Sequence, residues 1–195
     1  MPALSPVTLT GAHVRLEPLS LDHLDALANV GLDPDLWRLS FRQLETRDDM
    51  RAYIEEALQE QAEGRSLPFA TVDLASSTVV GCTRFGNIAL AHKRVEIGWT
   101  WVAKPWQRTA INTEAKLLML RYAFEALGCQ RVELKTDSRN TRSQNAMRRI
   151  GATEEGTLRK HMVTASGYIR DTVYFSILDS EWPAVEIRLT DRLAR

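Results

Sequence analysis

The chain has 195 residues, and its 25 lysines and arginines balance 25 aspartates and glutamates, so the formal net charge is zero. A chain of this length usually buries its own core, so we expect one domain over residues 1–195. The charge balance argues against a nucleic-acid partner, which normally requires a basic excess. No segment approaches the roughly 20 apolar residues that span a bilayer, and no cationic leader precedes an apolar run, so we expect a cytoplasmic protein without a membrane partner.

The amino-terminal part of the chain predicts one strand followed by two helices. Residues 7–18 alternate between apolar and polar side chains, which is typical of a half-buried strand. Ser20 precedes apolar residues at helical spacing and is expected to cap a short helix. A second helix opens at Thr46 with an acidic first turn and runs to Gly64.

The middle of the chain predicts three strands and a buried helix. Segments 67–74, 78–90 and 94–102 have the pattern of strands, and a short turn joins the first two. The helix expected at 112–127 is apolar nearly all round. Its polar residues form one narrow stripe, so we expect the helix to be largely buried. This stripe consists of Glu114, Arg121 and Glu125.

The last part of the chain predicts a strand, a basic helix and a hairpin. Residues 131–136 alternate as a strand does, and a loop around Asn140 leads into the short helix. The hairpin turns at Ser166–Gly167, and Ser180 is expected to cap a final helix. Strands and helices in this order predict a mixed α/β fold, with a central sheet covered by helices on both faces.

The loop before the long apolar helix has the chemistry of a phosphate-binding site. Gln107, Arg108 and Thr109 stand just before the expected helix start at Asn112. Helix N-termini expose unpaired N–H groups and carry about half a positive charge, so they attract phosphate. A basic cluster further on also favours an anionic ligand, with a solvated charged face as the alternative. This cluster comprises Arg139, Arg142, Arg148 and Arg149.

The two cysteines give no sign of a disulfide framework or a metal site. Cys82 lies in an apolar strand and Cys129 at a helix end, and the chain has no CxxC pattern. We therefore expect two free thiols and no bound metal.

Three segments, in order, resemble a known family. The loop Gln107–Asn112 (QRTAIN), followed by Thr-Glu-Ala, resembles the acyl-CoA-binding loop of GNAT-type N-acetyltransferases, and most closely their RimJ/RimL-like branch of ribosomal-protein N-terminal acetyltransferases. Further matches lie at 140–152, in the tail at 156–178, and at the amino-terminal 15–19. The resemblance thus covers most of the chain.

This resemblance implies a GNAT-like acyl-CoA N-acyltransferase fold. Such a fold has a mixed, mostly antiparallel sheet of about seven strands that is splayed in the middle. The strands at 94–102 and 131–136 are expected to run parallel and then separate, so that the pantetheine arm of acetyl-CoA enters the gap between them.

The implied activity is direct transfer of an acetyl group from acetyl-CoA to a primary amine, without a metal. The acceptor is either a protein N-terminal α-amine or a small-molecule amine, and both remain open. The alternative is a catalytically silent acyl-CoA-binding module that serves as a sensor or interaction partner, because two family side chains are replaced here. A homodimer is compatible with either function.

The resemblance also implies a set of coenzyme-binding residues. Asn140 is expected to bond the pantetheine amides, and its alternative role is to cap a helix. Ala110 and Asn112 replace the small glycines usual in the family, where glycine lets the backbone approach the pyrophosphate. The implied set is Trp101, Val102, Gln107, Arg108, Thr109, Ala110, Ile111, Asn112, Thr113, Asn140, Ser143 and Arg149.

Two residues are implied for the tetrahedral intermediate and the leaving group. The Val102 amide is expected to donate to the oxyanion, because rigid backbone N–H groups serve well in that role. The family often uses a tyrosine to protonate the thiolate, but Met147 stands at that position. Ser143 matches the serine of the RimJ/RimL-like branch and is expected to serve instead, unless it is merely a helix-start residue.

The general base stays open at this point. Related enzymes carry a glutamate where this chain has Met162. The adjacent His161 faces the other way in a regular strand, so it does not simply substitute. Glu96 and Asp171 are the other candidates, and each has an ion-paired or solvated role as its alternative.

The aromatic residues are expected mainly to pack. Trp99, Trp101 and Trp106 are assigned to the core and its loops rather than to base stacking. Trp37 and Phe41 belong to an irregular region and are candidates for the wall of an acceptor pocket, with a hydrophobic anchor as the alternative.

Overall fold

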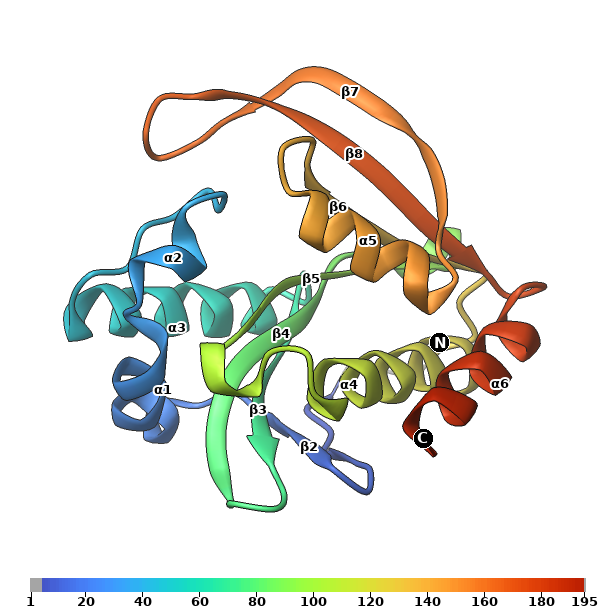
Figure 1. Ribbon diagram of the computed structural model, residues 1–195, viewed down its shortest axis with the longest axis horizontal. Helices are drawn as coiled ribbons and strands as arrows, with labels where there is room; N and C mark the ends of the chain where they lie inside the picture. Colours follow the sequence, from blue (N-terminus) through green and yellow to red (C-terminus); the bar gives the residue numbers. More distant parts are fainter. Residues whose placement is uncertain (1–4, 195) are drawn as a thin grey trace.

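A computed structural model describes residues 5–194 and shows a single eight-stranded sheet with helices packed against it (Figure 1). The strands are β1 (Leu9–Thr10), β2 (Val14–Pro18), β3 (Leu67–Asp73), β4 (Thr78–Ala89), β5 (Arg94–Val102), β6 (Arg131–Asp137), β7 (Thr153–Val163) and β8 (Ile169–Leu178). The α-helices are α1 (Leu24–Gly31), α2 (Pro34–Trp37), α3 (Arg47–Ala62), α4 (Ala110–Arg121), α5 (Thr141–Ile150) and α6 (Trp182–Leu193).

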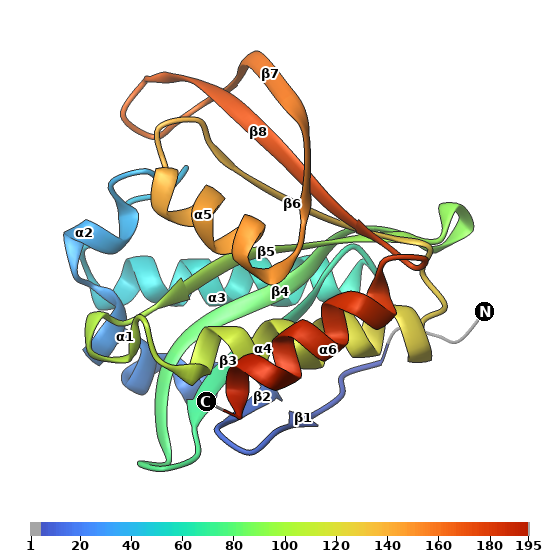
Figure 2. The ribbon, with the colours of Figure 1, turned by 45° about the vertical axis from the view of Figure 1, so that its right-hand side comes forward.

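The sheet confirms the expected mixed and splayed architecture. Its strand order is β1-β2-β3-β4-β5-β6-β8-β7, and every neighbouring pair is antiparallel except β5 and β6. Those two parallel strands pair only between Arg94–Glu96 and Arg131–Glu133 and then diverge (Figure 2). The sheet has eight strands rather than about seven, because residues 7–18 form a β1–β2 hairpin that turns at Gly11 instead of one strand.

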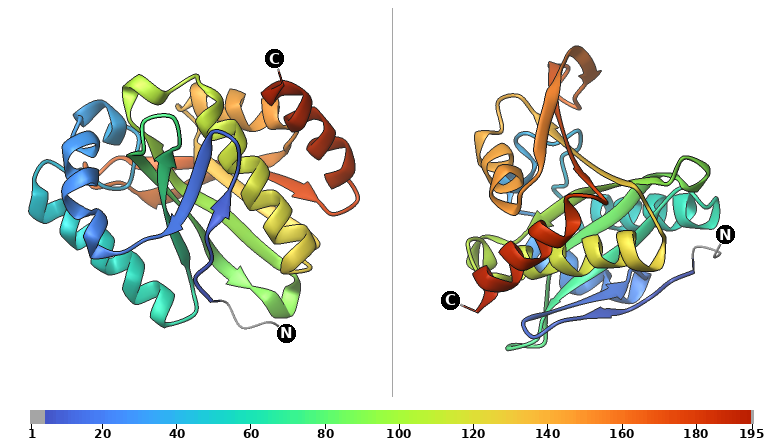
Figure 3. Two further views of the ribbon diagram at one scale, coloured as in Figure 1. Left: turned by 90° about the horizontal axis from the view of Figure 1, so that it is seen from below. Right: turned by 90° about the vertical axis from the view of Figure 1, so that its right-hand side faces the viewer.

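Two apolar cores lie on opposite faces of the sheet. Helices α4, α5 and α6 cover one face, and α1 and α3 cover the other (Figure 3). Adjacent strand residues divide between the cores, since Phe69 and Val102 belong to the first while Ala70 and Trp101 belong to the second. This period of two is the alternation of a sheet that is buried on both faces.

The helix starts follow their capping residues. Ser20 and Thr46 mark helix starts, as expected from the sequence, and each forms a capping box. Thr109 caps α4, so this helix begins at Ala110, two residues before the predicted start. The last helix follows Glu181, so the prediction that Ser180 caps it was wrong.

Helix α4 is buried as predicted, but its polar stripe is not a solvated one. Glu114 is 5% exposed and accepts hydrogen bonds from three amides of the β1–β2 hairpin. Arg121 pairs with Glu186 on α6. The helix also buries Lys116, which the predicted stripe omitted.

Neither cysteine forms a disulfide within residues 5–194. Cys82 and Cys129 are buried free thiols. No helix between residues 5 and 194 is long and apolar enough to cross a membrane, and no cluster of His, Cys, Asp and Glu in that range could hold a metal ion.

Candidate active site

The parting of β5 from β6 creates an open strand edge in the middle of the sheet. Beyond Glu96, β5 has no neighbour on its β6 side among the described residues. Ala103 N donates to Val80 O at 2.8 Å, which makes the register pair Gly81–Val102 a non-hydrogen-bonded one. The N–H and C=O groups of Val102 therefore point away from β4, toward the gap.

A bulge distorts β5 beside this gap. The register runs from Arg84–Gly98 to Cys82–Trp101, so Trp99 and Thr100 are both opposite Thr83. Trp99 has a positive φ of 50°, which a non-glycine residue rarely adopts. A bulge re-aims side chains where pairing ends. Here it places Thr100, an exposed residue, at the open part of the strand.

The loop before α4 ties the two sides of the gap together. Gln107 donates from Nε2 to the Val102 carbonyl at 2.7 Å and accepts at Oε1 from Arg142 Nη1 at 2.9 Å. The side chain thus joins the end of β5 to the first turn of α5. Thr109 Oγ1 accepts from the Ile111 amide at 3.4 Å, and Arg108 is exposed with φ at 65°.

Most of the residues implied for coenzyme binding meet at this place. The loop and the first turn of α4 supply Gln107 to Thr113, and the Gln107–Arg142 bond brings the start of α5 beside them. The Asn112 side chain presents a buried Oδ1 without a hydrogen-bond partner in residues 5–194. Arg149 lies apart, because it is exposed in the last turn of α5, roughly 9 Å of helix rise beyond Ser143.

Asn140 caps α5, the alternative that the sequence left open for it. Its Oδ1 accepts from the Ser143 amide at 3.0 Å. The Nδ2 group has no hydrogen-bond partner within the described residues, so capping leaves it available. Ser143 is half-buried at the third position of the helix.

Glu96 is buried on the face of the sheet opposite to α4. It is 3% exposed, and its Oε2 lies 2.9 Å from Lys135 Nζ and 2.6 Å from Asn87 Nδ2. Glu96 is therefore ion-paired, which is the alternative that the sequence leaves open for it. Its other carboxylate oxygen, Oε1, has no hydrogen-bond partner in residues 5–194. The aromatic rings of Trp99 and Tyr174 flank the Lys135 ammonium.

Another base candidate, His161, lies on a bulged part of β7. Leu158 pairs with Thr172 and Met162 with Arg170, so four residues of β7 span what two span on β8. The expected alternation between His161 and Met162 does not apply, because this stretch is not a regular strand. His161 is exposed and meets the Tyr174 ring edge-on at 5.8 Å.

Asp171 is engaged by the same bulge. One of its carboxylate oxygens accepts from the Lys160 amide at 2.6 Å, so it stabilises the irregular backbone of β7.

Two pockets lie on the face that carries Glu96. One of about 390 Å³ is bounded by the loop after α2, by α3 and by the tip of the β7–β8 hairpin, and Phe41, Tyr53 and Ala165 are among its lining residues. Trp37 is not among them, because it packs against Tyr53 and Trp101 in the core, 5% exposed. Of the two roles that the sequence leaves open for Trp37, this packing favours the hydrophobic anchor.

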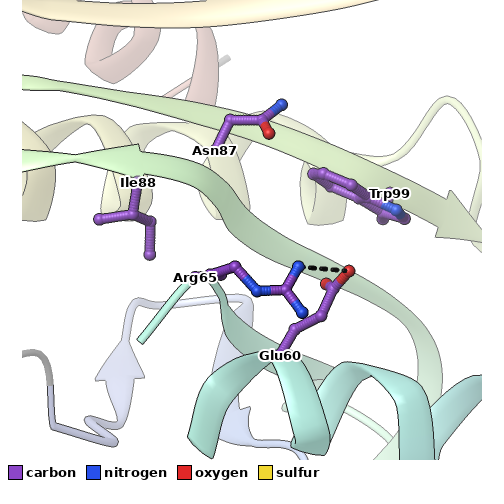
Figure 4. A pocket seen from close by; sticks show the side chains of 5 residues that line it. All are labelled: Glu60, Arg65, Asn87, Ile88 and Trp99. Atoms are coloured by element: carbon purple, nitrogen blue, oxygen red, sulfur yellow. Dashed lines mark ion pairs between the residues drawn. The ribbon is translucent and has the colours of Figure 1, made fainter. Parts of the chain in front are cut away.

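The second pocket, of about 190 Å³, lies beside the bulge (Figure 4). Glu60 and Arg65 form an ion pair at its edge, and Asn87, which also bonds Glu96, forms part of the lining with Ile88 and Trp99. Glu60 also pairs with the buried Arg84, whose guanidinium lies 4.6 Å from the centre of the Trp99 ring. This contact holds the bulged tryptophan in place.

Comparison with known proteins identifies the family. The profile of the acetyltransferase (GNAT) domain matches residues 13–153. Bacillus subtilis YdaF, provisionally named a ribosomal N-acetyltransferase, is 33% identical over 109 residues, which span 56% of this chain and 58% of that protein. This similarity agrees with the resemblance to the RimJ/RimL-like branch.

Solved structures agree over nearly the whole chain. A GCN5-related N-acetyltransferase from Brucella melitensis is 33% identical, with a TM-score of 0.91 over 98% of this chain and 87% of that one. Mycobacterium smegmatis RimJ in complex with CoA-disulfide shares the fold, with a TM-score of 0.82 and 24% identity over 96% of this chain and 95% of that one. The chain therefore belongs to the GNAT acetyltransferase family and is an acetyltransferase.

Proposed function

We propose that this protein transfers the acetyl group of acetyl-CoA directly to a primary amine. The observation that carries the proposal is the open edge of β5 beside the amino end of α4. An extended amide-bearing ligand can pair with an unpaired strand edge, and a diphosphate suits a helix N-terminus. The unpartnered Asn140 Nδ2 adds a donor at the start of α5, beside the same gap. Acetyl-CoA has both parts, a diphosphate and a pantetheine arm with two amides.

The residues around the gap supply the remaining needs of the reaction. The Val102 N–H, which points into the gap, suits the oxyanion of a tetrahedral intermediate. Glu96 lies on the face of the sheet opposite to α4, and its Oε1 is free of partners within the described residues. We choose it as the base that takes the proton of the amine. Lys135 and Asn87 hold its other oxygen, which fixes the carboxylate in place.

We propose a protein N-terminal α-amine as the acceptor. An α-amine has a pKa of about 8 and a lysine amine one of about 10.4, so much more of the α-amine is neutral at pH 7. YdaF is named a ribosomal N-acetyltransferase, which supports an acceptor that belongs to the ribosome. The pocket behind Phe41 and the hairpin tip lies on the Glu96 face and offers room for the residues that follow the amine.

The test combines calorimetric titration with acetyl-CoA and an assay of thiol release. We expect binding of acetyl-CoA and acetylation of short peptides with a free α-amine. Matched peptides with a blocked N-terminus and an internal lysine serve as the control and should react far more slowly. Absence of acetyl-CoA binding would refute the proposal. Binding without turnover on any peptide or small amine would favour the silent module.

Substitution of Asn140 separates capping from coenzyme binding. Asn140→Ala removes the cap of α5 and should lower stability by about 1 kcal/mol. Asn140→Ser keeps a capping oxygen but has no amide group, so we expect near-native stability and weaker acetyl-CoA binding. Thermal unfolding and calorimetry measure the two effects. Native affinity in the serine variant would show that the side chain acts only as a cap.

A further inference from the structure

Lys116 is buried in an unusual environment between α4 and the sheet. It is 6% exposed, and its Nζ donates to Thr100 Oγ1 at 2.8 Å and to Thr83 Oγ1 at 3.4 Å. No carboxylate lies within ion-pair distance of it among residues 5–194. A buried ammonium without a counterion costs free energy, and burial lowers the pKa of Lys116 to about 7. Stability alone does not account for such a residue.

The surrounding charges are committed elsewhere. Burial is the only cause of the lowered pKa. The other charged side chains on α4, β4 and β5 each bind a different partner. Arg84 pairs with Glu60, Arg94 with Glu133 and Glu96 with Lys135. Glu114 binds the β1–β2 hairpin, and Arg121 pairs with Glu186.

Thr100 connects this buried amine with the open gap. It belongs to the bulge of β5, is exposed, and lies where β6 has already departed. Its hydroxyl also lies 2.8 Å from Thr83 Oγ1, so the three polar groups form one cluster.

The cluster lies across β5 from Glu96. Val95 and Ile97 belong to the core under α4, so Glu96 between them faces the other way, toward Lys135. The two sides of the gap therefore carry a carboxylate on one face and a lysine-bound hydroxyl on the other. An acetyl transfer needs this pair of functions, because one proton leaves the amine and one must reach the sulfur.

We propose that Lys116, acting through the Thr100 hydroxyl, supplies the proton that the departing CoA thiolate takes up. The inference rests on the proposed acetyl transfer. The amine nitrogen bonds to the carbonyl carbon, and the C–S bond breaks with its electron pair on sulfur. The Thr100 proton passes to sulfur and is replaced by a proton from Lys116 Nζ, while Glu96 takes the proton of the amine. Solvent restores both side chains after the products leave.

Lys116 is thus a positioning residue, and its test includes a measurement that needs no acceptor. The thiol of bound CoA is titrated by its ultraviolet thiolate absorbance in the native protein, in Lys116→Met and in Thr100→Ser. Methionine keeps the length and apolar stem of lysine but removes the charge. We expect the pKa of the bound thiol to rise in Lys116→Met, because the Thr100 hydroxyl that Lys116 holds in place donates a hydrogen bond that favours the thiolate. Thr100→Ser retains the hydroxyl and should titrate as the native protein does.

Turnover gives the second measurement. In Lys116→Met we expect kcat for peptide acetylation to fall about 100-fold, while the Kd for acetyl-CoA stays within about threefold. Thr100→Val should act in the same direction, and because it changes an exposed side chain it repeats the test without altering the core. Unfolding curves verify that each variant is folded.

The outcomes distinguish this inference from the proposed function. An unchanged thiol pKa together with an unchanged kcat in Lys116→Met would overturn the inference alone. Parallel losses of affinity and kcat would also overturn it, because they indicate a merely structural lysine. A native protein that does not bind CoA would overturn both proposals. A native protein that acetylates no amine, but whose bound thiol responds to Lys116→Met, would refute the reaction and support the placement of Lys116 beside the sulfur.

Discussion

Replacement of Glu114 by alanine should lower the free energy of unfolding by about 3 kcal/mol, because it orphans several donors at once. The carboxylate accepts from the amides of Ala12, His13 and Val14 at 2.8, 2.6 and 2.7 Å. Val14 is completely buried, so water cannot replace that bond. Glu114 is therefore the anchor that holds the β1–β2 hairpin on α4, one turn after the loop that begins the helix.

Urea denaturation measures this effect, and the π-helical turn Tyr122–Ala126 that follows α4 offers a control. Glu125 is exposed and accepts only from Trp182 Nε1 at 3.1 Å, so Glu125→Ala should cost less than about 1 kcal/mol. Glu114→Gln keeps an acceptor oxygen but turns an NH₂ group toward the amides, and it should fall between the two. If Glu114→Ala unfolds at the native urea concentration, the hairpin does not depend on this carboxylate.

The sequence predicted the elements whose signals are local. Ser20 and Thr46 marked helix starts correctly, since a capping side chain acts within three residues of itself. The apolar alternation of β5 fixed its bounds at 94 and 102 as well. The sequence predicts one strand where the β1–β2 hairpin forms, because the turn at Gly11 lacks a two-residue turn signal and polar–apolar alternation continues past it.

Features that depend on partner strands were beyond the sequence. The bulges at Trp99–Thr100 and in β7 are defined by how each strand pairs with its neighbour. The sequence of one strand does not determine that pairing. For this reason the alternation expected of a regular strand does not apply to His161 and Met162. The partners of Glu96 could not be predicted from the sequence either, because Lys135 lies on β6 and Asn87 on β4.

Lys116 is a site residue that the sequence analysis misses although the sequence carries a signal for it. It stands in an otherwise apolar stretch of helix, four residues after Asn112, and so on the same face of α4. A charged residue on the buried side of a helix is expensive unless it is satisfied, which marks it for attention. Its hydroxyl partners Thr83 and Thr100 could not have been found, because the β5 bulge brings them together.

Glu96→Gln should lower kcat for acetylation of an α-amine by about 10²–10⁴-fold at neutral pH, with little change in acetyl-CoA affinity. The substitution keeps the shape of the side chain but removes its ability to take a proton. The deficit should narrow as the pH rises past about 8, because the free α-amine then loses its proton to solvent and needs the base less. A pH series of single-substrate kinetics measures both effects.

Glu133→Gln is the matched control, because Glu133 lies opposite Glu96 in the β5–β6 register and pairs with Arg94 and Arg131 instead. It removes one carboxylate from the same part of the sheet and should leave kcat within about twofold of native. Equal losses in the two variants would mean that the rate depends on the charge of the strand pair rather than on a base. A loss in Glu96→Gln that persists undiminished at high pH would show that Glu96 does not act by neutralising the protonated acceptor, since the free α-amine is already neutral there.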